Sequence, residues 1–233
     1  MSLFSLLGHS LLGRHLRHRH HHHHHSVDMN STTRTTDAKT GKTVLDARGG
    51  NDKINVHQNI DGSVTVRIND KETHQFTAEE ARCLEIKGGD GNDSITMTGQ
   101  QLYGMPNNIT ISGGKGNDKI YGGAGNQTLS GGEGNDIITG GAGNDRIFGG
   151  AGNDRIFGGS GGDYINGGAG NDSLYGQAGN DTIVGGGGYD YLVGGSGCDV
   201  GVGGREDYSV GIEKEIKPHP FFKKSVLNAI SAR

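Results

Sequence analysis

Ten carboxylate or amide side chains recur at nine-residue intervals between residues 113 and 202 of this chain. One is Gln127, and the others are Asp118, Asp136, Asp145, Asp154, Asp163, Asp172, Asp181, Asp190 and Asp199. Glycines come before each of these side chains, and they allow backbone angles that leave carbonyl oxygens crowded together. Carboxylate and carbonyl oxygens suit calcium, which takes six to eight oxygen ligands at about 2.3 to 2.6 Å. The spacing therefore predicts cation binding.

The elements that must hold these oxygens are nonapeptide repeats. In register the chain has ten units without an insertion: GGKGNDKIY, GGAGNQTLS, GGEGNDIIT, GGAGNDRIF, GGAGNDRIF, GGSGGDYIN, GGAGNDSLY, GQAGNDTIV, GGGGYDYLV and GGSGCDVGV. The eighth position is a large aliphatic residue in nine of the ten units. That period fits neither a helix nor a long alternating strand. We expect strands of about three residues joined by six-residue turns, with two units forming one coil of a flattened solenoid.

Stacking determines which carboxylates meet. If two units complete a coil, a turn lies against the turn 18 residues further along the chain. Asp154 should then share cations with Asp136 and Asp172, and Asp145 with Gln127 and Asp163. A turn made mostly of glycine is costly to order, so folding should be coupled to cation binding.

Composition supports a metal-stabilised protein. Only 30% of the 233 residues are hydrophobic, 46 are glycine and none is tryptophan, so a thick core is not expected. Residues 113–202 carry ten acidic and four basic side chains, a balance that repels nucleic acid. The sequence has no 18-residue apolar window for a membrane span. Its two cysteines, Cys83 and Cys198, lack metal-type spacing and are expected to be unpaired.

The units resemble the GGxGxDxUx nonapeptides of the RTX (repeats-in-toxin), or hemolysin-type, calcium-binding family, over about 90 residues. The resemblance implies an all-β fold, a right-handed parallel β-roll of about five coils. It implies up to about eight calcium ions, bound by the position-six carboxylates together with glycine and third-position carbonyls. The glycines concerned are Gly114, Gly116, Gly132, Gly134, Gly141, Gly143, Gly150, Gly152, Gly159, Gly161, Gly168, Gly170, Gly186 and Gly188.

Three residues depart from the family pattern. Gln127 replaces an aspartate, so its site should be weak or empty. Gln177 stands where the second glycine belongs and should strain its turn. Gly201 removes the aliphatic side chain from the last unit, and the roll is expected to end at residue 202.

The flanking segments differ from the roll. Residues 29–112 should form an irregular β-rich extension that caps it, with strands around "SVTVRIN" and "ETHQF" and a short helical turn at "AEEAR". This extension includes a lone unit with Asp93 as a candidate ligand and a degenerate one near Asp52. Residues 1–28 are His-rich, either an affinity tag or a native tract that binds zinc or nickel. Residues 203–233 form a degenerate repeat followed by a cap or an export signal.

The function expected is non-enzymatic: a calcium-dependent folding module of a secreted bacterial protein. The resemblance implies extracellular localisation and type I secretion machinery as a partner. The alternative is an adhesion or carbohydrate-binding module that presents Phe148, Phe157 and Tyr175 to a glycan or protein. A small exported toxin, effector or enzyme is a third reading. Ser160 lies in a G-x-S-x-G match, but no strand-to-helix context surrounds it, so we expect no catalysis there.

Overall fold

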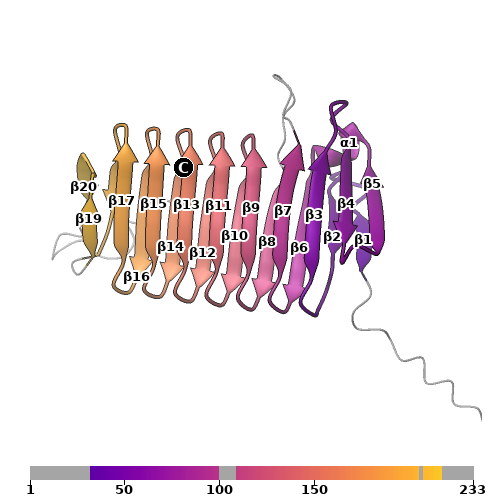
Figure 1. Cartoon of the computed structure of the whole chain (residues 1–233), viewed down its shortest axis with the longest axis horizontal. Coiled ribbons are helices and arrows are strands. Elements are labelled where there is room, and N and C mark those ends of the chain that lie inside the picture. Colours follow the sequence, from indigo (N-terminus) through magenta and orange to yellow (C-terminus); the bar gives the residue numbers. More distant parts are fainter. Residues whose placement is uncertain (1–31, 100–108, 205–206, 217–233) are drawn as a thin grey trace, which may run out of the picture.

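The computed structural model describes residues 32–99, 109–204 and 207–216, and it is a parallel β-solenoid. Two ten-stranded sheets lie face to face, and the chain alternates between them as it advances along the long axis (Figure 1). One short helix, α1 (Ala78–Ala81), is present in these residues. The all-β solenoid expected from the repeat is therefore confirmed.

The strands of both sheets are short. The first sheet contains, in spatial order, β1 (Thr33–Thr36), β2 (Thr43–Asp46), β6 (Leu84–Asp90), β8 (Thr110–Lys115), β10 (Thr128–Glu133), β12 (Arg146–Ala151), β14 (Tyr164–Ala169), β16 (Thr182–Gly187), β18 (Val200–Val202) and β20 (Lys214–Ile216). The second contains β19 (Tyr208–Val210), β17 (Tyr191–Ser196), β15 (Ser173–Ala178), β13 (Arg155–Ser160), β11 (Ile137–Ala142), β9 (Lys119–Ala124), β7 (Ser94–Gly99), β3 (Lys53–Gln58), β4 (Val64–Ile68) and β5 (Glu72–Phe76).

The repeat determines the register. Ile147 pairs in parallel with Leu129 on one side and Ile165 on the other, each 18 residues away. These eighth-position side chains are fully buried and form an aliphatic column between the sheets. The core of the roll is thus thin, with one large side chain per unit.

The strands are longer than the sequence predicted. Each central strand has six residues and each turn only three, Gly-Asn-Asp in most units, whereas three and six were expected. The reason is that the first three residues of each unit stay in the ladder, as the pairing of Gly132 with Gly150 shows. The prediction of three-residue strands and six-residue turns was therefore wrong.

The N-terminal region closes the solenoid with antiparallel strands. β1 pairs antiparallel with β2, and the expected strand pair, β4 and β5, adds antiparallel to β3. The expected helical turn is α1, which begins with a capping box between Thr77 and Glu80. The solenoid register starts earlier than Gly113, because β2 and β3 already pair in parallel with β6 and β7. The structure therefore has more coils than the five expected.

The C-terminal end also continues past residue 202. β19 and β20 add one parallel strand to each sheet, so the expectation that the roll ends at Val202 was wrong. Gly201 leaves a gap in the aliphatic column, and Ile212 packs into it: a Cβ atom placed on Gly201 would lie 3.0 Å from Ile212 Cγ2. The missing aliphatic residue is thus replaced from the following segment.

Candidate metal centre

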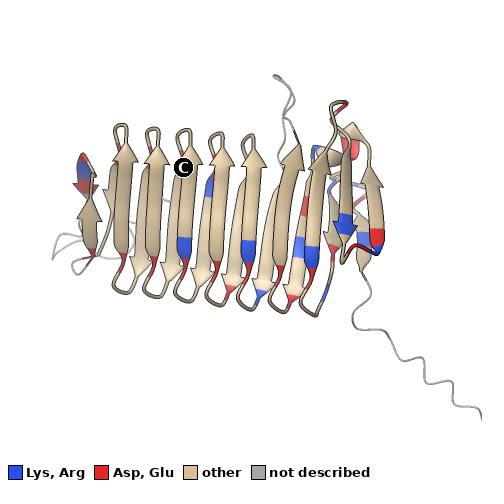
Figure 2. Cartoon of the chain, viewed as in Figure 1, with Lys and Arg blue, Asp and Glu red and all other residues tan. Residues whose placement is uncertain are grey.

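The repeated aspartates form two rows, one along each turn edge of the solenoid. Acidic residues gather where strands and turns meet (Figure 2). The first row, on the lower edge in Figure 1, contains Asp52, Asp93, Asp118, Asp136, Asp154, Asp172, Asp190 and Asp207. The second row contains Gln127, Asp145, Asp163, Asp181, Asp199 and Glu213.

One hydrogen bond repeats along both rows. The backbone N–H of Asp136 donates to Oδ1 of Asp154, 18 residues later, at 2.8 Å, and Asp154 donates likewise to Asp172. On the other edge Gln127 donates to Asp145, which donates to Asp163. The neighbours predicted from the period are confirmed. Each Oδ1 thus fixes its carboxylate against the preceding coil.

In eleven aspartates of the two rows the second carboxylate oxygen is buried and has no hydrogen-bond partner. This is true of Oδ2 in Asp52, Asp93, Asp118, Asp136, Asp145, Asp154, Asp163, Asp172, Asp181, Asp190 and Asp199. Ten of these side chains are 1 to 3% exposed; Asp52 is 9% exposed. An unpaired buried carboxylate oxygen is costly, and proteins offset it with a bound cation or a proton. The rows therefore need a positive partner.

The first glycine of each unit lets two oxygen atoms approach the backbone closely. A Cβ atom placed on Gly131 would lie 2.1 Å from Asp136 Oδ2 and 2.7 Å from the carbonyl oxygen of Gly149 in the next coil. A carboxylate oxygen and a carbonyl oxygen of the next coil therefore lie together against the glycine Cα, an approach that only glycine permits. Equivalent pairs of oxygen atoms adjoin Gly88, Gly140, Gly149, Gly158, Gly167 and Gly176.

These first-position glycines were missed by the sequence reasoning, which selected the second- and fourth-position ones. The second and fourth glycines have positive φ and pack against the preceding coil: a Cβ on Gly132 would lie 2.0 Å from the Gly114 carbonyl oxygen. A signal existed in the sequence, because position one is glycine in all ten units. Gln177 occupies the second position with φ of 79°, the strained conformation expected there.

Side chains alone do not make a metal cluster. Within the described ranges, no three His, Cys, Asp or Glu side chains gather closely enough to hold an ion. A site on these rows must therefore include backbone carbonyls, as calcium sites do. Oxygen-only donors also disfavour zinc, which prefers nitrogen and sulfur. The donor set fits calcium.

Burial affects the protonation of the rows. Desolvation, with repulsion from neighbouring carboxylates, raises the pKa of Asp136 and of Asp163 to about 7. Burial raises the pKa values to about 6 in Asp93, Asp145, Asp172 and Asp190. It also raises the pKa values of Asp118, Asp154 and Asp181. Without a cation the rows thus favour protons, for which a metal would compete.

The C-terminal ends of the rows include two residues that the sequence reasoning missed. Asp207 accepts from the N–H of Asp190 after 17 residues, and its other oxygen accepts from the N–H of Gly204. Glu213 accepts from the N–H of Asp199 after 14 residues. The shortened spacing hid both from a nine-residue search. A Cβ on Gly185 would lie 2.5 Å from Asp190 Oδ2 and 2.8 Å from Asp207 Oδ2, so two carboxylates converge there.

Asparagines form a second ladder on each edge. The N–H of Asn135 donates to Oδ1 of Asn117 at 2.7 Å, and Asn153 donates to Asn135 in turn. This bond runs toward the preceding coil, opposite in direction to the aspartate bond. The two ladders together hold each turn between its neighbours, which keeps the unpaired Oδ2 atoms in line.

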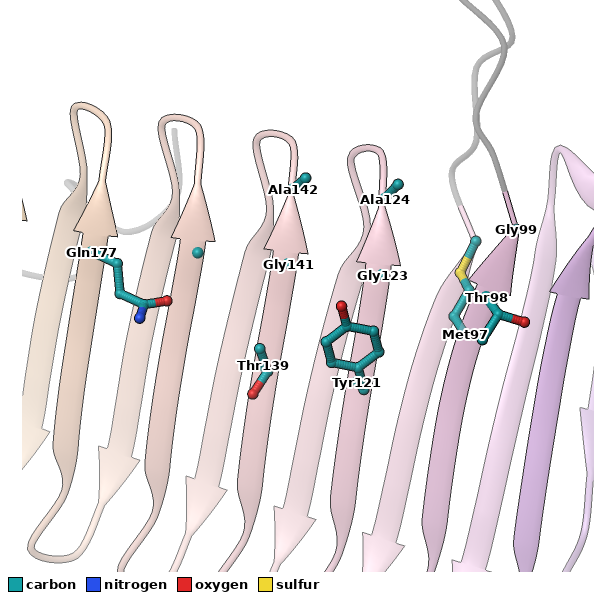
Figure 3. A pocket seen from close by; sticks show the side chains of 11 residues that line it. Met97, Thr98, Gly99, Tyr121, Gly123, Ala124, Thr139, Gly141, Ala142 and Gln177 are labelled. Atoms are coloured by element: carbon teal, nitrogen blue, oxygen red, sulfur yellow. The ribbon is translucent and has the colours of Figure 1, made fainter.

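The outer face of the second sheet has a shallow groove of about 570 Å³ beside Tyr121, Thr139 and Gln177 (Figure 3). Its lining contains no acidic, basic, histidine or cysteine side chain. Further along this sheet the rings of Phe157 and Tyr175 stack at 5.0 Å with an interplanar angle of 13°. This stacking covers one face of each ring and is the cross-strand aromatic pairing that stabilises sheets.

The other features considered in the sequence are the two cysteines, the terminal segments and a possible membrane span. Cys83 and Cys198 are exposed free thiols, as expected. The His-rich segment and the residues 217–233 expected to form a cap or export signal lie outside the described residues. In the part of the chain that is described, no helix is long and apolar enough to span a membrane.

Comparison with known proteins identifies the repeat. The family model described as RTX calcium-binding nonapeptide repeat matches at residues 85–96, 110–138, 121–156, 130–165, 157–192 and 175–207. No curated protein and no solved structure matches the chain. The matched segments coincide with the coils that carry the paired Asp rows, and their donors are those calcium prefers. Between residues 85 and 207, the chain therefore carries several copies of the RTX calcium-binding nonapeptide repeat.

Proposed function

We propose that this protein binds several calcium ions between stacked turns and that the roll folds when they bind. The observation that carries the proposal is the line of buried, unpartnered Oδ2 atoms, most of them close to a backbone carbonyl oxygen of the next coil. Bound calcium supplies the positive charge that allows these carboxylates to stay ionised and close together.

Each ion would be held by residues of two turns on one edge. In the position beside Gly131, Asp136 offers Oδ2 and Gly149 of the next coil offers its carbonyl oxygen. The second- and fourth-position glycines line the same turns, and their carbonyls are our candidates for the remaining ligands. Leaving out Asp52, the two rows have ten aspartates with an unpartnered Oδ2, which sets an upper bound of ten positions.

Two positions along the rows should differ from the others in calcium affinity. The Gln127 side chain is neutral, and its Nε2 donates to the Ala124 carbonyl oxygen at 2.7 Å. Oε1 is the atom of this side chain nearest the Gly122 position and is buried without a hydrogen-bond partner, but an amide oxygen lacks the full negative charge of a carboxylate, so the position beside Gly122 should bind calcium weakly. Where Asp190 and Asp207 converge beside Gly185, two carboxylates should bind calcium more tightly than one.

Calcium-dependent folding suits a secreted protein. Extracellular calcium modules bind with dissociation constants on the order of 10⁻⁴ to 10⁻³ M, so such a roll would be unfolded at cytosolic calcium and folded outside the cell. An unfolded glycine-rich chain can pass through an export channel. We therefore propose extracellular localisation and passage through a type I secretion system.

Calcium titration with two readouts tests the proposal. Calorimetry of the chelator-treated chain should show several ions per chain, and circular dichroism should show β-structure rising over the same calcium range. Magnesium at equal concentration is the control, since it demands octahedral geometry and should not substitute. A strand signal that is the same in chelator and in calcium would refute coupled folding.

A further inference from the structure

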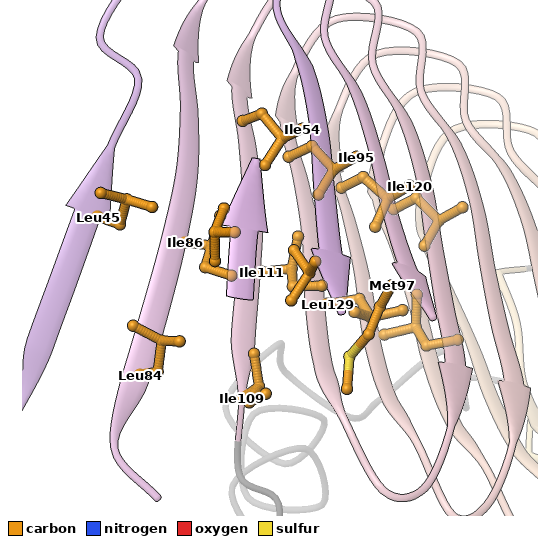
Figure 4. Close-up of a cluster of buried hydrophobic side chains, with 14 of the residues drawn as sticks. Leu45, Ile54, Leu84, Ile86, Ile95, Met97, Ile109, Ile111, Ile120 and Leu129 are labelled. Atoms are coloured by element: carbon orange, nitrogen blue, oxygen red, sulfur yellow. The ribbon is translucent and has the colours of Figure 1, made fainter. Parts of the chain in front are cut away.

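The N-terminal region differs from the roll in how it is held together. Residues 32–99 contain 13 buried hydrophobic side chains in 68 residues, against ten in the 90 residues of 113–202. Strands β3 and β4 each bury more than one large side chain, Ile54 and Val56 in the first and Val64, Val66 and Ile68 in the second. All five belong to the buried hydrophobic cluster, in which Ile54 lies beside Ile95 (Figure 4).

The region also contains a repeat unit whose first residue is not glycine. Residues 47–55 occupy a full nonapeptide position: Gly49 bridges to Asp90, and the N–H of Asp52 donates to Oδ1 of Asp93. The first position of this unit is Ala47, which is buried. Elsewhere a Cβ at that position would fall 2.1 to 2.5 Å from the Oδ2 of its own unit's aspartate, so the Ala47 methyl group occupies the place that Oδ2 approaches in the other units.

A side-chain amide replaces the coil that would precede this unit. Asn69 Nδ2 donates to Asp52 Oδ1 at 2.6 Å, where later aspartates accept a backbone N–H. Asn69 Oδ1 accepts from the N–H of Lys53 at 2.8 Å, where later units bond to a backbone carbonyl such as that of Asp93. Asn69 thus supplies both polar groups that a preceding coil would supply, and the first row begins with side-chain hydrogen bonds.

Antiparallel pairing and one arginine complete the closed end. The Arg34 guanidinium, from β1, donates to the Gln75 carbonyl oxygen and pairs with Glu80, and it lies 4.3 Å from the centre of the Phe76 ring. It therefore ties the first sheet to the last strand of the second. Local hairpins and a buried apolar cluster are contacts that form without metal.

We propose that residues 43–99 are a metal-independent template, folded in the absence of calcium, on which the calcium-dependent coils of residues 113–202 stack. Its exposed end presents strands β6 and β7, with Asp93 in place to accept the first ion. The template removes the largest entropic cost of folding the roll. Without it, the first coil would have to order its glycine backbone before contacts with a neighbouring coil could offset that cost. This inference rests on the calcium-dependent folding proposed above.

Hydrogen–deuterium exchange on the full chain separates the two proposals. In chelator, amides of residues 43–99 should be protected while those of 113–202 exchange freely, and calcium should then protect 113–202. Free exchange of residues 43–99 in chelator would overturn the template. Protection of residues 113–202 in chelator would instead refute calcium-dependent folding. The exchange of residues 43–99 would still show whether the template folds without metal.

A pair of matched variants tests the template by kinetics. Ile54→Ala removes a buried side chain from the template, and Ile183→Ala removes the same group from the distant end of the roll. After rapid addition of calcium, Ile54→Ala should slow roll formation by about 5- to 30-fold, whereas Ile183→Ala should mainly speed unfolding after chelation. Slowing of formation by Ile183→Ala alone would overturn the proposal. If Ile54→Ala unfolds the template outright, more calcium must be needed to fold the roll; an unchanged calcium midpoint would overturn it as well.

Discussion

Ile212 lies directly over Gly201 and takes the place that an aliphatic side chain of the repeat occupies in the preceding coils. At the end of the repeat, the following segment thus supplies the missing aliphatic side chain. The same segment supplies Asp207 and Glu213, which are the last members of the carboxylate rows. The C-terminal segment seals both the apolar column and the polar edges at once.

Removing the Ile212 side chain should loosen this end. Ile212→Ala leaves a cavity above Gly201, and because the side chain is only partly buried we expect about 1–2 kcal/mol of lost stability, below the range for a fully buried isoleucine. Denaturant unfolding in saturating calcium measures it. Ile60→Ala is the control, because Ile60 is 73% exposed and should change stability by less than about 0.5 kcal/mol. Equal effects of the two variants would show that Ile212 does not fill the column.

A single methyl group tests the proposed ion position. Gly131→Ala would place Cβ 2.1 Å from Asp136 Oδ2, so calorimetry should find fewer bound calcium ions, and stability should fall by about 1–3 kcal/mol. Gly187→Ala is the matched control, because a Cβ there meets nothing within 4 Å and its φ is ordinary. An unchanged calcium stoichiometry in Gly131→Ala would show that ions bind elsewhere.

The identical units that contain Asp145 and Asp154 should respond differently to the same mutation. Asp154 has Asp136 and Asp172 as neighbours, both with a free Oδ2, so Asp154→Asn should weaken two good positions. Asp145 has Gln127 on one side, so Asp145→Asn should weaken one good position and one already poor. Calcium binding measured by calorimetry should fall more in Asp154→Asn, and equal losses would contradict the row assignment.

The nine-residue period was sufficient to predict the solenoid, the aliphatic column and the neighbours within each row. It succeeded because two nine-residue units per coil place each aliphatic side chain beside the one 18 residues away, as the pairing of Ile147 with Leu129 and Ile165 confirms. It was insufficient for strand length. Propensity treats glycines as turn residues, but in this fold the ladder of the neighbouring coil keeps them in strands.

The ends of the rows could not be predicted from the period, because they depend on contacts between segments without a common spacing. Asn69 reaches Asp52 from a turn between two antiparallel strands, and Glu213 reaches Asp199 after 14 residues. Ala47 is visible in the sequence, because "ARGGNDKIN" has alanine at position one, where the other units have glycine. The consequence of this alanine depends on where the Oδ2 atoms lie, which the sequence alone does not show.

Acid should stabilise the calcium-free roll. Burial raises the folded pKa of Asp136 and Asp163 to about 7, above the ordinary value of 3.8, so the folded state holds more protons than the unfolded one between these values. That contribution is fully present below pH of about 4 and is lost as pH rises through about 7. In chelator, β-structure should therefore be greater at pH 5 than at pH 8.

With calcium the order should reverse, because protons compete with the ion for the carboxylates. Circular dichroism across pH, with and without calcium, measures both trends. Stability of the chelated chain that rises from pH 5 to pH 8 would contradict the burial of uncharged carboxylates in the apo roll.

The asparagine ladder is interrupted at Gly162, and restoring it should stabilise the protein. Gly162 donates its N–H to Asn144 Oδ1 at 2.8 Å but has no side chain to offer Asn180. The φ of Gly162 is not positive, and asparagine occupies this position in the turns on either side, so Gly162→Asn should fit although its Cβ lies 3.1 Å from the Asn180 carbonyl oxygen.

We expect a gain of about 0.5–1.5 kcal/mol from the new hydrogen bond, measured by denaturant unfolding in calcium. Gly162→Ala is the matched control, because it adds the same Cβ and the same restriction of the unfolded chain without the amide. Gly162→Asn should exceed Gly162→Ala if the side-chain amide accepts from Asn180. Equal stability of the two variants would assign the effect to backbone entropy, and the asparagine ladder would then be a consequence of stacking rather than a cause of it.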